Sequence, residues 1–317
     1  MALPDLTGRF RADLAALGFA GGKLALAVSG GPDSLALLAL AHAALPAAVE
    51  AATVDHGLRE AGAAEARAVA AICADIGVPH MVLTVEVAPG NVQSEARTAR
   101  YTALARWMEA RGLAALATAH HADDQAETLL LRLNRASGVA GLAGVRARGA
   151  VPGTQLPLLR PLLGWRRAEL AGVVDAQGWQ AADDPSNTDD RFDRARLRKE
   201  LARADWLDVP ALAASAAHLA DADAALAWAA AREWNECVER APMGLTYRPR
   251  APRAVALRVI ARIVAELDGT AARGSALARL FDALVARQPA SIGGLVARAV
   301  PEGWTFSKAP RRASTRT

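Results

Sequence analysis

The 317-residue sequence is poor in cysteine and in aromatic residues. Its two cysteines, Cys73 and Cys237, are far apart in segments of helical character, and no Cys-x-x-Cys pair is present. This spacing argues against a zinc or dithiol site and indicates two buried, inert thiols in a reducing compartment. Aromatic residues make up 4% of a chain that is 52% hydrophobic, so alanine, leucine and valine must fill most of the core.

The sequence also lacks an apolar run long enough to span a bilayer, and residues 1–19 lack the apolar core of a signal peptide. We therefore expect a cytoplasmic protein without membrane association. The net charge of +4 is compatible with an RNA partner. It does not require one, because many basic proteins bind no nucleic acid.

Apolar runs and amphipathic segments alternate through the first half of the chain. Nearly continuous apolar strands followed by helices are typical of a parallel sheet that is covered on both faces. Ligands of such a sheet bind beyond the carboxyl ends of its strands. The expected strands are 23–28, 49–54, 81–85 and 114–119, and the expected helices are 35–44, 61–76, 94–111 and 124–134.

The second half of the chain changes in character near Pro210. We expect an α/β, Rossmann-like domain over 1–208, a smaller and mostly helical domain over 209–307, and a disordered basic tail over 308–317. Segment 138–163 is rich in glycine, proline and arginine and is expected to be irregular. Further helices are expected at 166–177, 192–203, 211–238, 254–267 and 275–287, and a hairpin at 292–306.

A glycine-rich hexapeptide, SGGPDS, directly follows the first expected strand. Two glycines permit positive φ angles and close approach of the backbone to a ligand, so successive N–H groups can hold phosphate oxygens. The aspartate would repel a bare phosphate and makes sense as a ligand of Mg²⁺. The alternative is an ordinary strand-to-helix turn. The candidate phosphate-binding residues are Ser29, Gly30, Gly31, Pro32, Asp33 and Ser34.

No lysine follows these glycines, so the loop is not a Walker A motif, and its spacing does not match a dinucleotide fingerprint. Asp55 and His56 follow the second expected strand and could contact a nucleotide. An isolated Asp-His pair is more often a simple turn.

Three polar residues follow the fourth expected strand. His120, Asp124 and Glu127 have the spacing of one helical face, where they could bind an ammonium group or act as acid and base. A helix start with stabilising acids is one alternative, and a His/Asp/Glu metal site is another.

Arginines form two further groups. Arg97 and Arg100 are one helical turn apart and could meet phosphates, although a solvated helix face is the alternative. Residues 191–203 carry six basic residues against two acidic ones, which favours an RNA or phosphate role beside the turn at 183–187. The candidate RNA contacts are Arg97, Arg194, Arg196 and Arg198.

The hexapeptide resembles the PP-loop of the N-type ATP pyrophosphatases, which split ATP between its α and β phosphates. Together with other motifs it resembles the tRNA(Ile)-lysidine synthetase family, which has an adenine nucleotide alpha hydrolase-like fold. The similarity covers about two thirds of the chain, in order. Its further motifs are 54–59 (VDHGLR), 91–93 (NVQ) with 96–97 (AR) and 100–101 (RY), 119–128 (AHHADDQAET), and 184–187 (DPSN) before the arginine run.

This resemblance implies a two-step reaction with ATP, Mg²⁺, free lysine and a tRNA(Ile) with a CAU anticodon. The wobble cytidine is adenylated, and the lysine amine then displaces AMP to give lysidine. No protein partner is implied, and a homodimer is compatible with the sequence. Asp183 and Ala195 depart from the family's usual Glu and Asn.

The resemblance also implies residue roles. Asp33, through Mg²⁺, would stabilise the departing pyrophosphate, and Asp124 and Glu127 would bind lysine. Two other readings stay open, a tRNA thiolase with the same loop and an inactive tRNA-binding protein. This chain lacks the paired cysteines that are usual in tRNA thiolases. Its intact acidic residues argue against an inactive tRNA-binding protein. The implied catalytic residues are Asp33, Arg100, His120, Asp124 and Glu127, with Asp55 and His56 at ATP.

Overall fold

The chain divides into two compact units, Met1–Ala220 and Asp221–Thr317. The boundary falls within helix α9 (Val209–Cys237). The sequence places it at residue 208, near the start of this helix, and that assignment stays a prediction. Among the helices that the structure describes, none combines the length and hydropathy that a membrane crossing requires. The structure, a computed structural model, describes residues 3–57, 60–86, 92–182 and 193–309.

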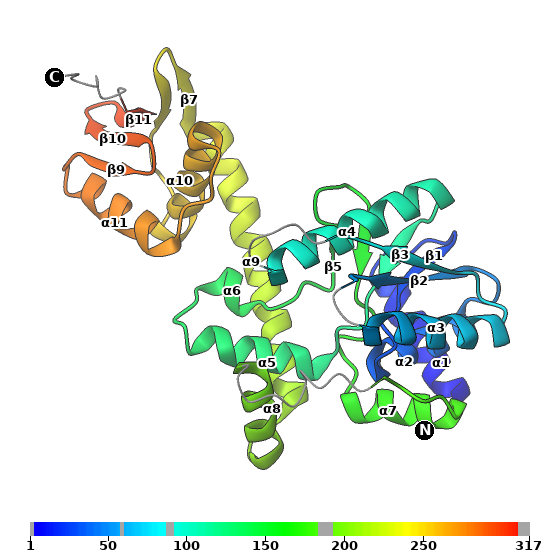
Figure 1. Cartoon of the computed structure of the whole chain (residues 1–317). Coiled ribbons are helices and arrows are strands. Elements are labelled where there is room, and N and C mark those ends of the chain that lie inside the picture. Colours follow the sequence, from blue (N-terminus) through cyan, green and yellow to red (C-terminus); the bar gives the residue numbers. More distant parts are fainter. Residues whose placement is uncertain (1–2, 58–59, 87–91, 183–192, 310–317) are drawn as a thin grey trace. The chain divides into compact units, whose positions relative to one another are not determined.

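The first unit is built on a six-stranded sheet in the order β3-β2-β1-β4-β6-β5 (Figure 1). Neighbouring strands are parallel except for the edge strand β5, which is antiparallel to β6. The predicted parallel sheet is therefore confirmed. The strands are β1 (Leu24–Ala27), β2 (Val49–Asp55), β3 (His80–Thr84), β4 (Ala115–Ala117), β5 (Arg148–Ala150) and β6 (Pro157–Leu159).

Helices cover both faces of this sheet, which explains the apolar strands. On one face Phe10, Leu37 and Val174 belong to a single buried cluster. On the other face Tyr101 and Met108 pack with residues of the sheet. The helices are α1 (Leu3–Ala16), α2 (Pro32–Ala44), α3 (Glu60–Asp75), α4 (Val92–Arg111), α5 (Ala122–Leu133), α6 (Val139–Leu142), α7 (Arg167–Gln177) and α8 (Asp193–Arg203).

Two parts of the first unit differ from expectation. Segment 138–163 is not irregular throughout, because it contains α6, β5 and β6. Strands of three residues are too short to give a periodic pattern among glycines and prolines. The N-terminal segment forms α1, which the sequence did not indicate. That helix is fixed to the core where Trp165 Nε1 donates to Asp13 Oδ2 at 2.8 Å.

The second unit contains a five-stranded antiparallel sheet in the order β7-β8-β11-β10-β9. Helices α10 (Arg253–Asp268) and α11 (Gly274–Val285) share one buried cluster with this sheet. The hairpin expected at 292–306 corresponds to β10 and β11 and is part of the larger sheet. The strands are β7 (Val238–Ala241), β8 (Gly244–Tyr247), β9 (Ala290–Ile292), β10 (Leu295–Val300) and β11 (Gly303–Lys308).

Trp304 of β11 is a packing residue. Its ring lies edge-on to Tyr247 at 5.9 Å and to Phe281 at 5.4 Å between centroids, and 9% of the residue is exposed. The indole is therefore part of the core of the second unit.

Candidate active site

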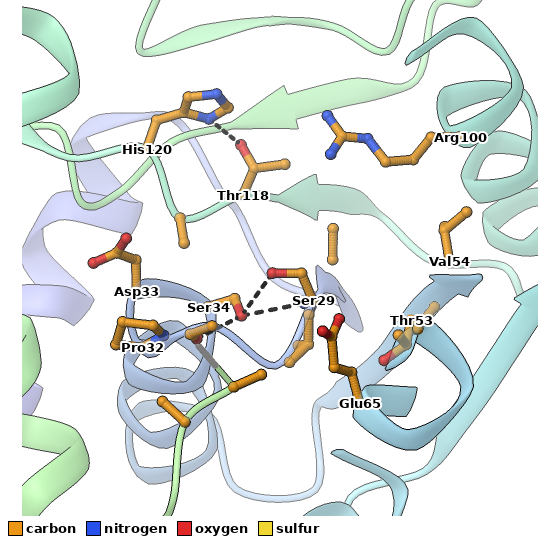
Figure 2. A pocket seen from close by; sticks show the side chains of 18 of the residues that line it. Ser29, Pro32, Asp33, Ser34, Thr53, Val54, Glu65, Arg100, Thr118 and His120 are labelled. Atoms are coloured by element: carbon orange, nitrogen blue, oxygen red, sulfur yellow. Dashed lines mark hydrogen bonds between the residues drawn. The ribbon is translucent and has the colours of Figure 1, made fainter. Parts of the chain in front are cut away.

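A cavity of about 900 Å³ lies at the carboxyl ends of β1, β2 and β4 (Figure 2). The polar clusters that follow these strands surround one space, as the strand order predicts. Its volume is near the upper end of the range of about 300–1,000 Å³ for small-molecule sites. Its charged and hydroxyl-bearing lining residues are Ser29, Asp33, Ser34, Thr53, Asp55, His56, Glu65, Arg100, Tyr101, Thr118, His120, Asp124, Arg167, Arg194 and Arg198.

The loop at 29–34 has the backbone of an anion site. Gly30 has φ +89°, which an L-residue adopts only with strain, and Gly31 is the N-cap of α2 with φ −72°. The Ser34 hydroxyl accepts from Ser29 N at 3.1 Å and donates to Gly31 O at 2.9 Å. Ser34 thus holds the loop in shape, while the start of α2 faces the cavity with its positive end.

Asp33, in the first turn of α2, lines the cavity with 26% of its side chain exposed. Its Oδ2 lies 3.4 Å from His121 Nε2 and 3.9 Å from an Arg167 guanidinium nitrogen. Its Oδ1 is buried and has no hydrogen-bond partner in the described part of the chain. Burial alone would raise the pKa of Asp33, but His121 and Arg167 outweigh it and lower the pKa, so the carboxylate is ionised.

His121 lies among three carboxylates, and its side chain is fully buried. Besides Asp33, its Nε2 is 3.6 Å from Asp124 Oδ2, and its Nδ1 is 3.6 Å from Asp123 Oδ2. Burial alone would lower the pKa of His121, but Asp123 and Asp33 raise it to about 9. The ring is therefore an imidazolium at neutral pH, a buried positive charge matched by acidic neighbours.

His120 has the opposite electrostatic setting. Its Nδ1 lies 3.0 Å from the Thr118 hydroxyl, and the ring lines the cavity (Figure 2). Burial lowers the pKa of His120 to about 4, and although Asp124 acts against this, Arg160 and Arg100 add to it. His120 is therefore neutral at neutral pH.

The expected single helical face of His120, Asp124 and Glu127 does not form. His120 precedes α5, because His121 is the N-cap of that helix and its backbone N–H donates to Asp124 Oδ2 at 3.1 Å. Asp124 lines the cavity, whereas Glu127 is 2% exposed and accepts two hydrogen bonds from Arg198. Direct binding of lysine by Glu127 would require this ion pair to open, so the lysine role of Glu127 stays a prediction.

Asp55 and His56 both line the cavity at the end of β2. Asp55 Oδ1 accepts from Gly57 N at 2.9 Å, a turn that holds the carboxylate in place. Burial lowers the pKa of His56, and the nearby Arg100 adds to this, so the ring is neutral. Both residues border the cavity, and their contact with a nucleotide stays a prediction.

The predicted arginines separate into two sets. Arg100, Arg194 and Arg198 line the cavity. Arg97 and Arg196 are exposed and lie outside its lining, and Arg196 pairs with Asp193 at 2.6 Å. Only the first set can reach a ligand inside the cavity.

Several motif residues lie outside the described residues. These include Arg59, Asn91 and the turn at 184–187, together with its neighbour Asp183 and the start of the arginine run at 191. Ala195, where the family usually has Asn, is buried on α8.

The sequence reasoning missed three residues of the charged centre, namely His121, Asp123 and Arg167. Asp123 accepts from Arg166 Nε at 3.2 Å and from the Arg167 backbone N–H at 2.9 Å. A helical pattern could not find them, because the contacts link α2, α5 and α7. The available signal was the pair of adjacent histidines before two aspartates at 120–124.

The cysteines have no part in this site. Cys73 is buried in the core of the first unit, and burial raises the pKa of its thiol to about 11. Cys237 is buried in the cluster of the second unit. Neither lines the cavity, so the cysteine chemistry of the thiolase alternative finds no support here.

Comparison with known proteins gives one family. Residues 7–205 match the PP-loop domain family. The chain is 48% identical to the tRNA(Ile)-lysidine synthase of Novosphingobium aromaticivorans, covering 99% of this chain and 97% of that protein. It is 40% identical to the tRNA(Ile)-lysidine synthase of Zymomonas mobilis, covering 92% and 90%.

A solved structure supports the fold alone. The U34-tRNA thiolase NcsA from Methanococcus maripaludis has a TM-score of 0.55 and 16% identity, over 68% of this chain and 77% of that one. At this identity the likeness does not extend to chemistry. The full-length similarity to curated relatives does, and the chain belongs to the tRNA(Ile)-lysidine synthase family, whose members are ligases with an ATP-binding PP-loop domain.

Proposed function

We propose that this chain joins L-lysine to the wobble cytidine of a tRNA(Ile) with a CAU anticodon. In the first step the ring carbonyl oxygen of cytidine attacks the α-phosphorus of ATP, and the bond to the β-phosphate breaks to release pyrophosphate. In the second step the ε-amine of lysine attacks the ring carbon. The carbon–oxygen bond then breaks, AMP leaves, and the amine gives up a proton. Because tRNA is its substrate, the enzyme would work in the cytoplasm.

The observation that carries this proposal is the pair of acidic groups in one cavity. Asp33 and Asp124 are 26% and 25% exposed, and each lies within 3.6 Å of the same His121 nitrogen. Two substrates of opposite charge must meet here, since one brings phosphates with a metal and the other brings an ammonium group. Asp33 beside the phosphate-binding loop suits the first, and Asp124 suits the second.

The residues at the ATP end fit Mg²⁺. Asp33 Oδ1 is a buried carboxylate oxygen without a hydrogen-bond partner among the described residues, and carboxylate oxygen is a preferred ligand of Mg²⁺. In the described part of the chain no three acidic, histidine or cysteine side chains form a complete metal site. Asp33 would therefore hold the ion together with ATP phosphates. When bound, the ion supplies charge stabilisation for the departing pyrophosphate.

The chain's own cations would stabilise the same leaving group. Arg167, Arg198 and the positive end of α2 all border the cavity near Asp33. Fixed positive charges in a partly buried site stabilise developing negative charge without reorganising at the moment of reaction.

At the lysine end, Asp124 would bind the ammonium group. His120 is neutral, so it does not repel an incoming cation and can accept a hydrogen bond from it. Glu127 acts indirectly, because it fixes the position of Arg198 beside the cavity. The exposed Arg97 and Arg196 are proposed to contact the tRNA backbone rather than the reacting groups.

The test is lysine incorporation by the purified protein. With ATP, Mg²⁺, labelled lysine and the CAU-anticodon tRNA(Ile), we expect label in the tRNA and one AMP for each lysine incorporated. Absence of label, together with AMP release that does not depend on the tRNA, would contradict the proposal. A tRNA with a CAU anticodon that carries methionine is the specificity control.

Variants locate the two ends of the site. Asp33→Asn should lower pyrophosphate release about 100-fold or more, the size of effect seen when one group that stabilises transition-state charge is lost. Its tRNA affinity should stay within about twofold of the parent, because backbone contacts dominate that affinity. Asp175→Asn, an exposed aspartate on α7, is the matched control. Near-normal activity of Asp33→Asn would contradict the metal role.

A further inference from the structure

His121 is buried beside the cavity, in contact with Asp33 and Asp124 of its lining, but has no place in the reaction as proposed above. Its ring is fully buried. It therefore cannot be a surface acid or base that exchanges protons directly with solvent. Its neighbours are the carboxylates of Asp33, Asp123 and Asp124, at 3.4 to 3.6 Å from the ring nitrogens.

The two carboxylates at Nε2 come from different elements. Asp33 is in the first turn of α2 and Asp124 is in the first turn of α5. Under the proposed function, which this inference requires, the first serves ATP and the second serves lysine. One oxygen of each carboxylate therefore lies within 3.6 Å of the same ring nitrogen.

The other ring nitrogen lies 3.6 Å from a carboxylate that is itself held in place. Nδ1 faces Asp123, which accepts from Arg166 and from the backbone of Arg167 at the start of α7. The backbone N–H of His121 donates to Asp124. These contacts fix both the ring and its main chain, so Nε2 is held at one point between α2 and α5.

We propose that His121 is the positioning residue that couples the two half-reactions, because it holds the carboxylates of Asp33 and Asp124 at one ring nitrogen. Without the ring, neither carboxylate would keep the contact that fixes its position at the border of the cavity. Each would turn away, and both substrates would lose their orientation.

The test compares four single variants in two separate measurements. The first measurement is tRNA-dependent exchange of labelled pyrophosphate into ATP without lysine, which reports adenylation. The second is the Kd of lysine by calorimetry without ATP, which reports the other subsite. The variants are Asp33→Asn, Asp124→Asn, His121→Gln and His42→Gln.

The pattern of losses distinguishes coupling from a local effect. Asp33→Asn should lower exchange and leave the lysine Kd within about twofold, and Asp124→Asn should do the reverse. His121→Gln should change both by about 10- to 100-fold, the usual cost of removing a group that orients others. His42→Gln, at the far end of α2, should change neither. A His121→Gln protein that loses only one property, or neither, overturns the inference.

Folding is controlled by a second variant. Removing the ring leaves three acidic groups together, so the single variant can lose stability. In His121→Gln/Asp123→Asn one of these charges is also removed, and the melting temperature should recover. Both functional losses should persist in this double variant, because Asp33 and Asp124 still lack the ring that contacts both. Recovery of both properties would overturn the inference. Failure of the parent protein to incorporate lysine would instead contradict the proposed function.

Discussion

Arg198 of α8 donates two hydrogen bonds to the buried Glu127 carboxylate of α5, from Nε to Oε1 at 2.8 Å and from Nη2 to Oε2 at 3.3 Å. Glu127 is 2% exposed and Arg198 is 27% exposed. Such a two-point pair fixes direction as well as distance. It connects the basic helix α8 with α5 at the border of the cavity, so its loss should affect both stability and the site.

Arg198→Met should lower the free energy of unfolding by about 2–3 kcal/mol, because it leaves the Glu127 carboxylate buried without a partner. This is less than the roughly 3–5 kcal/mol expected for a fully buried pair, since Arg198 is partly exposed. Urea unfolding measures the effect. The matched control is Arg203→Met on the same helix, whose pair with Glu200 is 75% and 67% exposed and should contribute less than about 0.5 kcal/mol.

The double variant Arg198→Met/Glu127→Gln separates loss of the pair from loss of packing. Removing the charge on Glu127 as well should restore part of the stability, because no uncompensated carboxylate remains. Equal losses in Arg198→Met and Arg203→Met would show that Glu127 is not held in the buried state described here.

The two glycines of the loop should respond differently to alanine. Gly30 has a positive φ, so Gly30→Ala should lower stability by about 1–2 kcal/mol through backbone strain. Gly31 has φ −72°, and an added Cβ would meet only Ser29 Oγ, at 3.8 Å. Gly31→Ala should leave the melting temperature close to that of the parent yet weaken ATP binding, because the new methyl group stands in the cavity wall. Thermal unfolding and nucleotide titration measure the two effects, and equal melting temperatures for both variants would contradict the argument.

The fold was readable from the sequence where elements were long enough to show a period. The strands β1 to β4 and the helices between them follow from apolar runs and amphipathic segments. Strands β5 and β6 did not, because three-residue strands in a glycine-rich and proline-rich segment carry no pattern. Strands β7 (VERA) and β8 (GLTY) were missed because neither is an apolar run, unlike the equally short β1 (LALA).

The site was readable where a residue's neighbours are close in sequence. The loop at 29–34 and the clusters after β2 and β4 reach one cavity because parallel strands end at one edge. The charge state of each residue was not readable. Adjacent histidines have opposite pKa shifts, because burial and nearby arginines lower the pKa of His120, whereas Asp123 and Asp33 raise that of His121, and Asp33 lies on a different helix. Glu127 likewise has the spacing of a cavity residue, but its partner is on α8.

The low pKa of His120 predicts a stability change with pH. Its folded value of about 4 lies below the ordinary value of 6.5, so between these pH values the unfolded chain binds more protons. The contribution of His120 to the free energy of unfolding is complete above pH 6.5 and is lost as the pH falls toward 4. Between pH 6.5 and 4.5 the parent should lose about 2 kcal/mol more than His120→Gln, since one pKa unit corresponds to about 1.4 kcal/mol.

Urea unfolding at several pH values measures this difference. His218→Gln, an exposed histidine of α9, is the control and should follow the parent curve. Parallel curves for the parent and His120→Gln would show that the ring is not held neutral by its surroundings.

Substitutions of Arg97 and Arg100, both on α4, should distinguish effects on tRNA binding from effects on adenylation. Both guanidinium groups lie near the Tyr101 ring, at 5.0 and 5.1 Å from its centroid. Only Arg100 lines the cavity, whereas Arg97 is exposed. Arg97→Ala should reduce the slope of log K for tRNA binding against log salt concentration by about one. The rate of adenylation should not change.

Arg100→Ala should do the reverse, with adenylation about 10- to 100-fold slower and an unchanged salt slope, because it removes a fixed charge beside the reacting phosphates. Filter binding at about 50 to 300 mM salt measures the salt slope of tRNA binding. Pyrophosphate exchange measures the rate of adenylation. An equal effect of the two substitutions on the salt slope would place Arg100 on the tRNA backbone instead. The position of Arg100 in the cavity lining, beside His56 and His120, argues against that outcome, because a guanidinium there lies next to the ends of β2 and β4.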